Sequence, residues 1–510
     1  MLAYRFGEFE LRPNERLLVR AGEPIVVGAR AFDLLTYLID HRDRVVPKAE
    51  LLDQVWPGLA VEEANLTVQV SSLRKALGPQ ALSTVPGRGY RFVLPVAELA
   101  SDARRVADPG ATPPTSARPS IAVMPFVNLS GDPEHDLFAD GLVEDLITTL
   151  SKISGLTVIA RASTFTYKGR PLDIRQVGRE LDVQHVMAGS VRISAGRLRV
   201  AAQVIDARMG AQLWAERYDR LLDDVFALQD EIALILVTEL QVQLIEGEQA
   251  RLRRASIRNF EAWSHWVRGL ACYNRAVLSR AGMTPALMSW QRAAALDPGS
   301  ATLQAMLGML YYLDARFGFW NDRATAMSKG SEHVMAARSL DPECVDAHTV
   351  LALLRLLQGQ HVDAVAAARS SLSFGPNSAD AAAFASFVFA NAGLGPDAVV
   401  QIERAVRLCP MFPPFYLGHM GLAYRTAGRI REAIAAFEAY NRLNAGHGLV
   451  DLVMLHGQRG ETDKARVWAD RLLSVFPDFT LRAWRQTQFR ADAGAIQADM
   501  AALRTFDLPE

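Results

Sequence analysis

Cysteine is scarce in this chain, with three residues among 510. Cys272, Cys344 and Cys409 lie far apart in the sequence, so we expect small buried side chains rather than disulfides or a metal site. No run of about 18 uncharged apolar residues occurs, which argues against a transmembrane helix. An excess of one charge is lacking too: 55 Lys and Arg face 56 Asp and Glu. Overall charge therefore does not indicate a nucleic-acid partner.

Motifs of common enzyme classes are also missing. There is no G-x-x-x-x-G-K-[ST] phosphate loop, no G-x-S-x-G nucleophile turn and no His-x-x-x-His pair. The ten histidines are scattered without metal-ligand spacing. We therefore predict that the chain is not an enzyme, with no catalytic residue, no metal and no cofactor. The first residues lack the apolar core of a signal peptide, so we expect a cytoplasmic protein without a membrane partner.

The length is too great for one hydrophobic core and indicates several domains. Residues 104–119 are rich in Pro, Ala, Ser and Thr, which is typical of a linker. We expect a multidomain chain: residues 1–97 as one unit, 98–119 as a linker, 120–250 as an α/β domain with a connecting helix, 261–485 as helical repeats, and 486–510 as a C-terminal cap or tail.

The N-terminal unit shows alternating strand patterns, then three helical segments, then a hairpin pattern at residues 83–94 with glycines on both sides of Arg88. The third helical segment, residues 62–77, places its leucines and Val70 on one stripe at helical spacing. Its remaining faces carry polar side chains, namely Asn65, Thr67, Gln69, Ser71, Ser72, Arg74 and Lys75.

Charge is unevenly distributed within this unit. Residues 1–63 contain 8 basic and 11 acidic side chains, whereas residues 64–97 contain four basic side chains and no acid. Amides, hydroxyls and cations on one helix suit the base edges and phosphates of duplex DNA. The alternative interpretation is a solvated face on a purely structural helix, and composition alone does not decide between the two.

The order of elements, ending in TVPGRGYRFV, resembles the OmpR/PhoB-type winged helix-turn-helix over about 95 residues. VEEANLTVQVSSLRKALG is similar to the recognition helix of that family. The resemblance implies that this helix enters the major groove and that the hairpin, the wing, touches the minor groove. By motif position, the implied DNA-binding residues are Asn65, Thr67, Gln69, Ser71, Ser72, Arg74, Lys75 and Arg88.

One departure from the family pattern concerns charge. Family members often have Arg where this chain has Pro86, and further basic residues at Ser71 and Ser72. Fewer cations imply weaker phosphate anchoring per monomer, which favours a homodimer or tandem DNA sites. We also expect no phospho-acceptor receiver domain before the winged helix, so regulatory input is expected from the C-terminal side.

The middle segment alternates strand and helix patterns and contains a hairpin pattern around Ala195-Gly196. Through IAVMPFVNLSGDPEHDLFADGLVEDL, VIARASTFTYKG and GAQLWAERYDR it resembles a domain similar to the TolB amino-terminal domain, which implies an architecture more than an activity. Asp140 and Glu144 are either paired acids for chemistry or acids that complement a helix dipole. Residues 161–170 either hold an anion or form an ordered loop, and we favour the loop.

Prolines recur at the ends of helical segments in the C-terminal region, at intervals of 44, 34, 34 and 67 residues. A 34-residue helix-pair period is the tetratricopeptide signature. We predict about six repeats forming an all-α superhelix with a concave groove, and an insertion at residues 317–327. The recurring prolines are Pro298, Pro342, Pro376, Pro410 and Pro477, and the recurring second-helix alanines are Ala286, Ala364, Ala398, Ala433 and Ala465.

These patterns together predict a one-component bacterial transcription regulator. Its winged helix would bind specific double-stranded DNA, and its repeats a protein or peptide partner. Two alternatives remain open: an interaction scaffold, and an adenylate-cyclase-like signalling protein without a recognisable catalytic domain.

Overall fold

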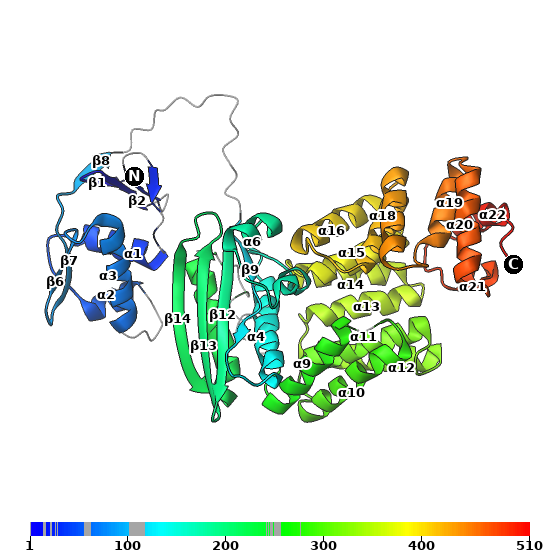
Figure 1. Ribbon diagram of the computed structural model, residues 1–510, viewed down its shortest axis with the longest axis horizontal. Coiled ribbons are helices and arrows are strands. Elements are labelled where there is room, and N and C mark those ends of the chain that lie inside the picture. Colours follow the sequence, from blue (N-terminus) through cyan, green and yellow to red (C-terminus); the bar gives the residue numbers. More distant parts are fainter. Residues whose placement is uncertain are drawn as a thin grey trace.

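The computed structural model describes residues 2–13, 17–20, 23–25, 27, 29–55, 63–100, 118–240, 242, 244, 248, 257–275 and 277–510. Three units follow one another, with the N-terminal unit and the last helices at opposite ends of the molecule (Figure 1). Among the helices of these residues, none is long and apolar enough to cross a membrane. The predicted multidomain fold class is confirmed: a winged helix, a mixed-sheet domain and all-α repeats.

The N-terminal unit packs three helices between two sheets. Its helices are α1 (Ala29–Asp40), α2 (Lys48–Val55) and α3 (Glu63–Leu77). The strands of the larger sheet, in spatial order, are β4 (Glu23–Ile25), β3 (Leu17–Arg20), β2 (Phe9–Arg12), β1 (Leu2–Phe6) and β8 (Ala97–Ala100). The smaller sheet has the order β5 (Val46–Pro47), β7 (Gly89–Phe92), β6 (Leu82–Val85). Pairing of β8 with β1 carries the sheet to Ala100, three residues beyond the expected boundary.

A single hydrophobic core holds this unit together. The stripe predicted for α3 is buried, with Leu66, Val70 and Leu73 at most 1% exposed. Strand β7 is tied to the core through Phe92, whose ring meets that of Phe6 edge-on at 5.1 Å between centroids. Because these apolar residues face inward, the polar residues of α3 face away from the core.

The middle domain is a mixed sheet covered by helices. Its strands are β9 (Ser120–Val123), β10 (Val127–Asn128), β11 (Thr157–Val158), β12 (His185–Ser194), β13 (Arg197–Asp206) and β14 (Gln212–Leu221). Its helices are α4 (Glu134–Ser151), α5 (Arg161–Thr164), α6 (Ile174–Leu181) and α7 (Val225–Glu239). Strands β11, β9 and β12 are parallel, and β12, β13 and β14 are antiparallel. The hairpin expected at Ala195-Gly196 joins β12 to β13, with positive φ at both residues.

The acids of α4 are paired with cations from the segment 161–170. Lys168 lies 2.6 Å from Asp140, and Arg161 lies 2.8 Å from Glu144. The Arg161 guanidinium also covers the Phe165 ring at 3.7 Å from its centroid. These contacts agree with the ordered-loop interpretation. Within the described ranges, no cluster of His, Cys, Asp or Glu has the grouping needed for a metal ion.

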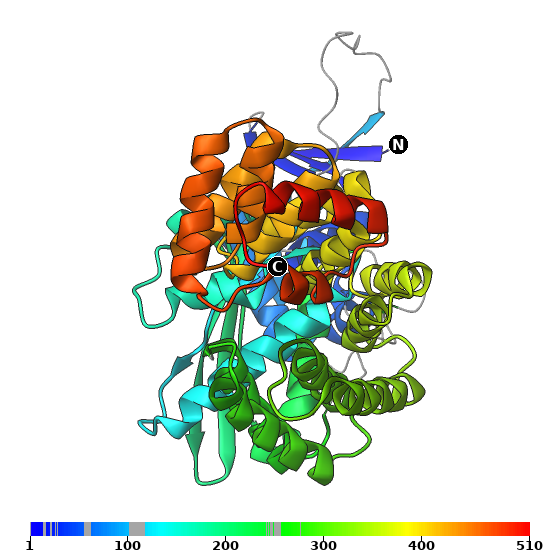
Figure 2. The same cartoon turned by 90° about the vertical axis from the view of Figure 1, so that its right-hand side faces the viewer.

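The repeat region forms an arc of six helix pairs that begins beside α4 and ends near the C-terminus (Figures 1 and 2). The pairs are α9 (Phe260–Arg275) with α10 (Arg280–Leu296), α11 (Ala301–Phe317) with α12 (Arg323–Leu340), α13 (Val345–Leu357) with α14 (His361–Phe374), α15 (Ala379–Asn391) with α16 (Gly395–Leu408), α17 (Phe415–Thr426) with α18 (Ile430–Leu443), and α19 (Leu449–Gln458) with α20 (Thr462–Val475). Two further helices, α21 (Leu481–Gln486) and α22 (Ala493–Arg504), follow.

Small residues let paired helices approach closely, as the sequence predicts. The five second-helix alanines are all 0% exposed. A Cβ added at Gly421 would lie 2.6 Å from the Phe437 ring of the facing helix. The longer 44-residue interval contains an α11–α12 connection in which the buried Asp314 carboxylate accepts hydrogen bonds from the backbone N–H groups of Trp320 and Asn321.

Candidate nucleic-acid interface

The outer face of α3 presents a continuous row of side chains. Ser71, Ser72 and Lys75 are exposed, as is Thr67, while Asn65, Gln69 and Arg74 are half-buried. Val68, 59% exposed, lies in the middle of this row at helical spacing with Ser71, Ser72 and Lys75. Sequence reasoning missed Val68, although its place among polar neighbours was a usable signal. An exposed apolar side chain there can meet a thymine methyl group.

The two cations of α3 differ in their surroundings. The Arg74 guanidinium turns toward the wing, where Nη2 donates to the Leu82 carbonyl at 2.9 Å and to Thr84 Oγ1 at 2.6 Å. Lys75 is exposed and forms no ion pair with any other residue that the structure describes. Arg74 therefore joins α3 to β6, whereas Lys75 points its charge outward.

The wing is the β6–β7 hairpin, which lies at the end of the molecule away from the middle domain (Figure 1). Its turn is closed by a hydrogen bond from the Arg88 N–H to the Val85 carbonyl at 3.0 Å, and the Arg88 side chain is exposed at the tip. At the base, Arg91 Nε donates to the Arg42 carbonyl at 3.1 Å. Of the cations in residues 64–97, Lys75 and Arg88 thus extend outward, and Arg74 and Arg91 hold the wing in place.

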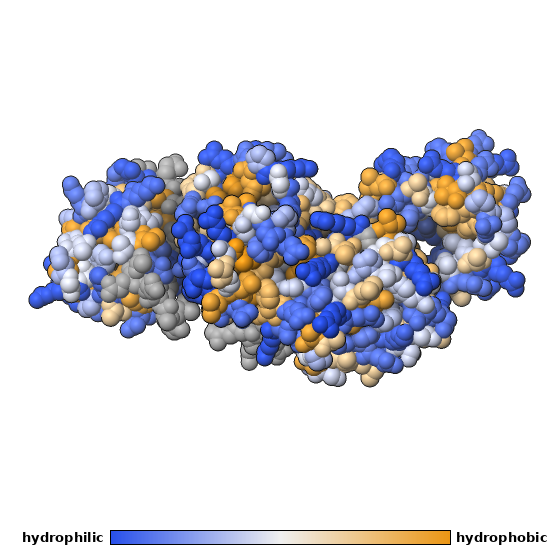
Figure 3. Space-filling model, turned by 60° about the horizontal axis from the view of Figure 1, so that its bottom comes forward, coloured by the Kyte–Doolittle hydropathy of each residue, from blue (hydrophilic) through white to orange (hydrophobic). Residues whose placement is uncertain are grey.

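Several acids elsewhere in the unit form ion pairs with arginine. Hydrogen bonds from Arg44 and Tyr37 lower the pKa of Glu50 to about 2. Glu10 is paired with Arg12, which lowers the pKa of that carboxyl. These acids are paired with arginines of their own surface, and residues 64–97 contain no acid that would offset the cations of α3 and the wing. On the face in Figure 3 the N-terminal unit, at the left, is mainly hydrophilic, and hydrophobic residues gather over the middle of the molecule.

Two family models match the chain. Residues 22–92 match the family described as "Transcriptional regulatory protein, C terminal", a range that includes α3 and the wing. Residues 116–235 match "HilA/YgeH-like transcriptional regulator, second domain", which covers the mixed sheet and most of α7. The expected likeness of this domain to TolB stays a prediction.

The proteins to which the chain is similar include one named as an adenylate cyclase and one named as a transcriptional regulator. "Putative adenylate cyclase 3" of Rhizobium meliloti (strain 1021) is 47% identical over 204 residues, 40% of this chain and 34% of that protein. "Transcriptional regulator HilA" of Salmonella typhi is 23% identical over 413 residues, 79% of this chain and 70% of that protein. The structure titled "DNA binding domain of E. coli CadC" is 31% identical, covering 19% of this chain and 96% of that chain, with a TM-score of 0.18. The match to the first relative thus spans about a third of that protein's length.

The chain therefore combines an OmpR/PhoB-type winged-helix domain, a HilA-like second domain and tetratricopeptide-like helical repeats. The middle domain is therefore HilA-like by sequence, and the chain is similar to the transcriptional regulator HilA over 79% of its own length.

Proposed function

We propose that this chain regulates transcription by binding specific duplex DNA with α3 and the wing, and that its repeats bind a protein or peptide partner. The observation that supports this most directly is the outer face of α3, where Lys75 and two serines surround Val68 within a unit that matches a regulatory DNA-binding family. Cations and hydroxyls of this kind anchor phosphates, and amides reach base edges.

The roles we propose differ along the surface. Gln69 and Asn65 would read base edges, Lys75 and the hydroxyl groups would hold phosphates, and Arg88 would approach the minor groove. Arg74 would act through the wing that it anchors as well as through DNA. The proposed DNA-binding set is Asn65, Thr67, Gln69, Ser71, Ser72, Arg74, Lys75 and Arg88, to which we add Val68.

The remaining proposals concern the whole protein. Two sparsely charged helices on a palindromic site would bind more tightly than one, so we propose action as a homodimer or on tandem sites. Because chromosomal DNA would be the target, we place the protein in the cytoplasm.

We propose no enzymatic activity. The cyclase relative makes cyclic AMP formation the second candidate, and the purified chain incubated with ATP and Mg²⁺ or Mn²⁺ tests it directly.

The DNA-binding proposal is tested by titrating the full chain against fragments of the host genome in mobility-shift assays at several salt concentrations. We expect a subset of fragments to shift, with affinity falling steeply as salt rises. Binding to none of them at any salt concentration contradicts the proposal. If no fragment binds and protein partners stay associated with the chain after nuclease treatment, the chain is an interaction scaffold instead.

A matched set of variants separates the two cations of α3. Lys75→Ala should weaken binding to all sequences and reduce the salt slope by about 1, because one phosphate contact is lost. Arg74→Ala should weaken binding by about 1–3 kcal/mol and also raise hydrogen exchange in β6, because three hydrogen bonds to that strand are lost. Arg208→Ala, which removes an exposed cation of the middle domain, is the control. Equal effects of all three variants would contradict the proposed roles.

A further inference from the structure

The segment between α21 and α22 is neither helix nor strand, and it crosses the repeats with its backbone hydrogen-bonded to them. The Phe489 carbonyl accepts a hydrogen bond from His361 Nε2 at 2.7 Å, and the Ala491 N–H donates to the Asn391 carbonyl at 2.8 Å. His361 begins α14 and Asn391 ends α15, so residues 488–491, the crossing segment, bridge two consecutive helix pairs. Main-chain hydrogen bonds to a groove are a general means of holding an extended peptide.

The crossing segment places an aromatic ring in a site built by the first helices of the pairs. The guanidinium carbon of Arg316, at the end of α11, lies 5.5 Å from the centroid of the Phe489 ring. The same guanidinium lies 5.1 Å from the ring of Phe387 and 5.2 Å from that of Phe317. A cation among aromatic faces favours one more aromatic ring over an aliphatic side chain.

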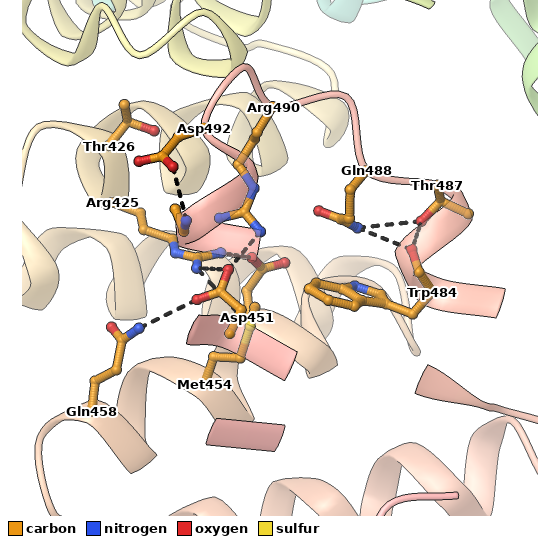
Figure 4. Close-up of polar contacts among 12 residues, drawn as sticks. Arg425, Thr426, Asp451, Met454, Gln458, Trp484, Thr487, Gln488, Arg490 and Asp492 are labelled. Carbon is orange, nitrogen blue, oxygen red and sulfur yellow. Dashed lines mark hydrogen bonds and ion pairs between the residues drawn. The ribbon is translucent and has the colours of Figure 1, made fainter. Parts of the chain in front are cut away.

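The next residue, Arg490, enters a charged site (Figure 4). Its side chain is 11% exposed and lies 2.5 Å from Asp499, which Arg425 also contacts at 2.5 Å. Arg425 further pairs with Asp451 at 3.1 Å. Two acids and two arginines balance here, so removal of Arg490 leaves a net negative site. This charge favours a cationic side chain at that position.

The fit of Arg490 is incomplete. Within the described residues its buried Nε has no hydrogen-bond partner, and an unpaired buried donor is unfavourable. Beneath the crossing segment lies a cavity of 2290 Å³, lined by first helices of the pairs, by α4 and by residues 484 and 486–490. The groove therefore contains cavity volume that the crossing segment does not fill, and Arg490 has a hydrogen-bond donor that the groove does not satisfy.

We propose that the crossing segment is a resident peptide, and that the external partner of the repeats is an extended peptide in which an aromatic residue directly precedes an arginine. Such a peptide binds by displacing residues 488–491 from the same two sites. The inference rests on the proposed protein-binding role of the repeats and specifies the chemistry of that partner.

The test uses the full chain and a labelled peptide with the sequence QTQFRAD, copied from residues 486–492. The double variant Phe489→Ala, Arg490→Ala empties both sites and leaves His361 and Asn391 in place. We expect it to bind the peptide at least tenfold more tightly than the unaltered chain does, as measured by fluorescence anisotropy. Asp451→Asn in the double variant should weaken that binding at least threefold, and Asp478→Asn, an exposed acid, should not. Equal peptide affinity of the emptied and unaltered chains overturns the proposal.

A second measurement uses the unaltered chain and therefore does not depend on whether a variant folds. Excess QTQFRAD added to the unaltered chain should raise hydrogen exchange in residues 488–491, whereas QTQAAAD should not. No difference between the two peptides overturns the proposal. Dimerisation of the unaltered chain through this segment, seen by light scattering, would make the occupant a second copy and overturn an external partner. Mobility shifts of the same proteins report DNA binding separately, so failure of the peptide experiment with DNA binding retained overturns this inference alone.

Discussion

At the scale of single residues, the wing depends on a glycine that no other residue can replace. Gly89 has φ +150°, and a Cβ there would lie 1.9 Å from the Val46 carbonyl oxygen of the paired strand. Gly89→Ala must therefore separate β5 from β7. We expect a loss of about 2–4 kcal/mol from the winged helix, by combined backbone strain and steric displacement. Hydrogen exchange in residues 82–92 measures the loss, and DNA affinity should fall with it.

Gly87 provides the matched control for this prediction. It also has a positive φ, +72°, but a Cβ there would meet nothing within 4 Å. Gly87→Ala should cost only about 1 kcal/mol, the conformational part of the effect. If both variants lose the same protection, close approach of Val46 is not what requires glycine at position 89.

At the scale of elements, Asp145 joins α4 to α7 and α9 and should make that junction sensitive to pH. Its Oδ2 accepts hydrogen bonds from Trp263 Nε1 at 2.7 Å and Gln229 Nε2 at 2.8 Å. Burial raises the pKa of Asp145 to about 6, against these two donors, which favour the ionised form. The folded state then holds a proton that the unfolded chain releases above about pH 4. Stability therefore falls as pH rises from about 4 to 6, and is constant above that range as far as this group is concerned.

Asp145→Asn keeps an acceptor oxygen for both donors and removes the titration. We expect the variant to match the unaltered chain near pH 4 and to exceed it by up to about 3 kcal/mol above pH 6. Thermal unfolding between pH 4 and 7 measures the difference, and Asp478→Asn, an exposed acid, should give a flat one. A difference between Asp145→Asn and the unaltered chain that does not change with pH would contradict the assignment.

Local patterns predicted the elements whose form depends on local spacing. The buried stripe of α3, the turn at Ala195-Gly196 and the buried second-helix alanines follow from periodicity and turn chemistry. Contacts between distant residues were not predictable in this way. Nothing near Arg74 in the sequence indicates that it binds the Leu82 carbonyl, and nothing near Asp140 indicates its pairing with Lys168.

The candidate site was predictable to a similar extent. Helical spacing identified the outward row of α3, because its inward residues are apolar. Which of its cations point outward depends on the wing, a separate element that packs against α3 only in the folded state. The crossing segment was expected merely as a cap or tail, since residues 488–491 have no pattern of their own and their conformation follows from two helix pairs far earlier in the chain.

At the scale of the whole molecule, the repeats are bonded to the middle domain through the turns between helix pairs. The Asn377 side chain donates to the Ile153 carbonyl at 2.6 Å, and its backbone N–H donates to the Ser151 carbonyl at 3.0 Å. One repeat further on, the Ala160 N–H donates to the Leu408 carbonyl at 2.8 Å. Two of these bonds join backbone to backbone across the two units, so a change in the groove of the repeats can reach the middle domain through them.

Asn377→Ala tests this connection. The Ile153 carbonyl would lose its donor inside a buried contact, which costs about 1–3 kcal/mol. We expect faster hydrogen exchange in residues 150–165 and a larger radius of gyration in solution scattering, because the two units separate more often. Asn274→Ala, at an exposed asparagine of α9, is the control. Unchanged exchange in residues 150–165 would mean that packing around α4 and α9, including the Asp145–Trp263 bond, holds the units together without the turns.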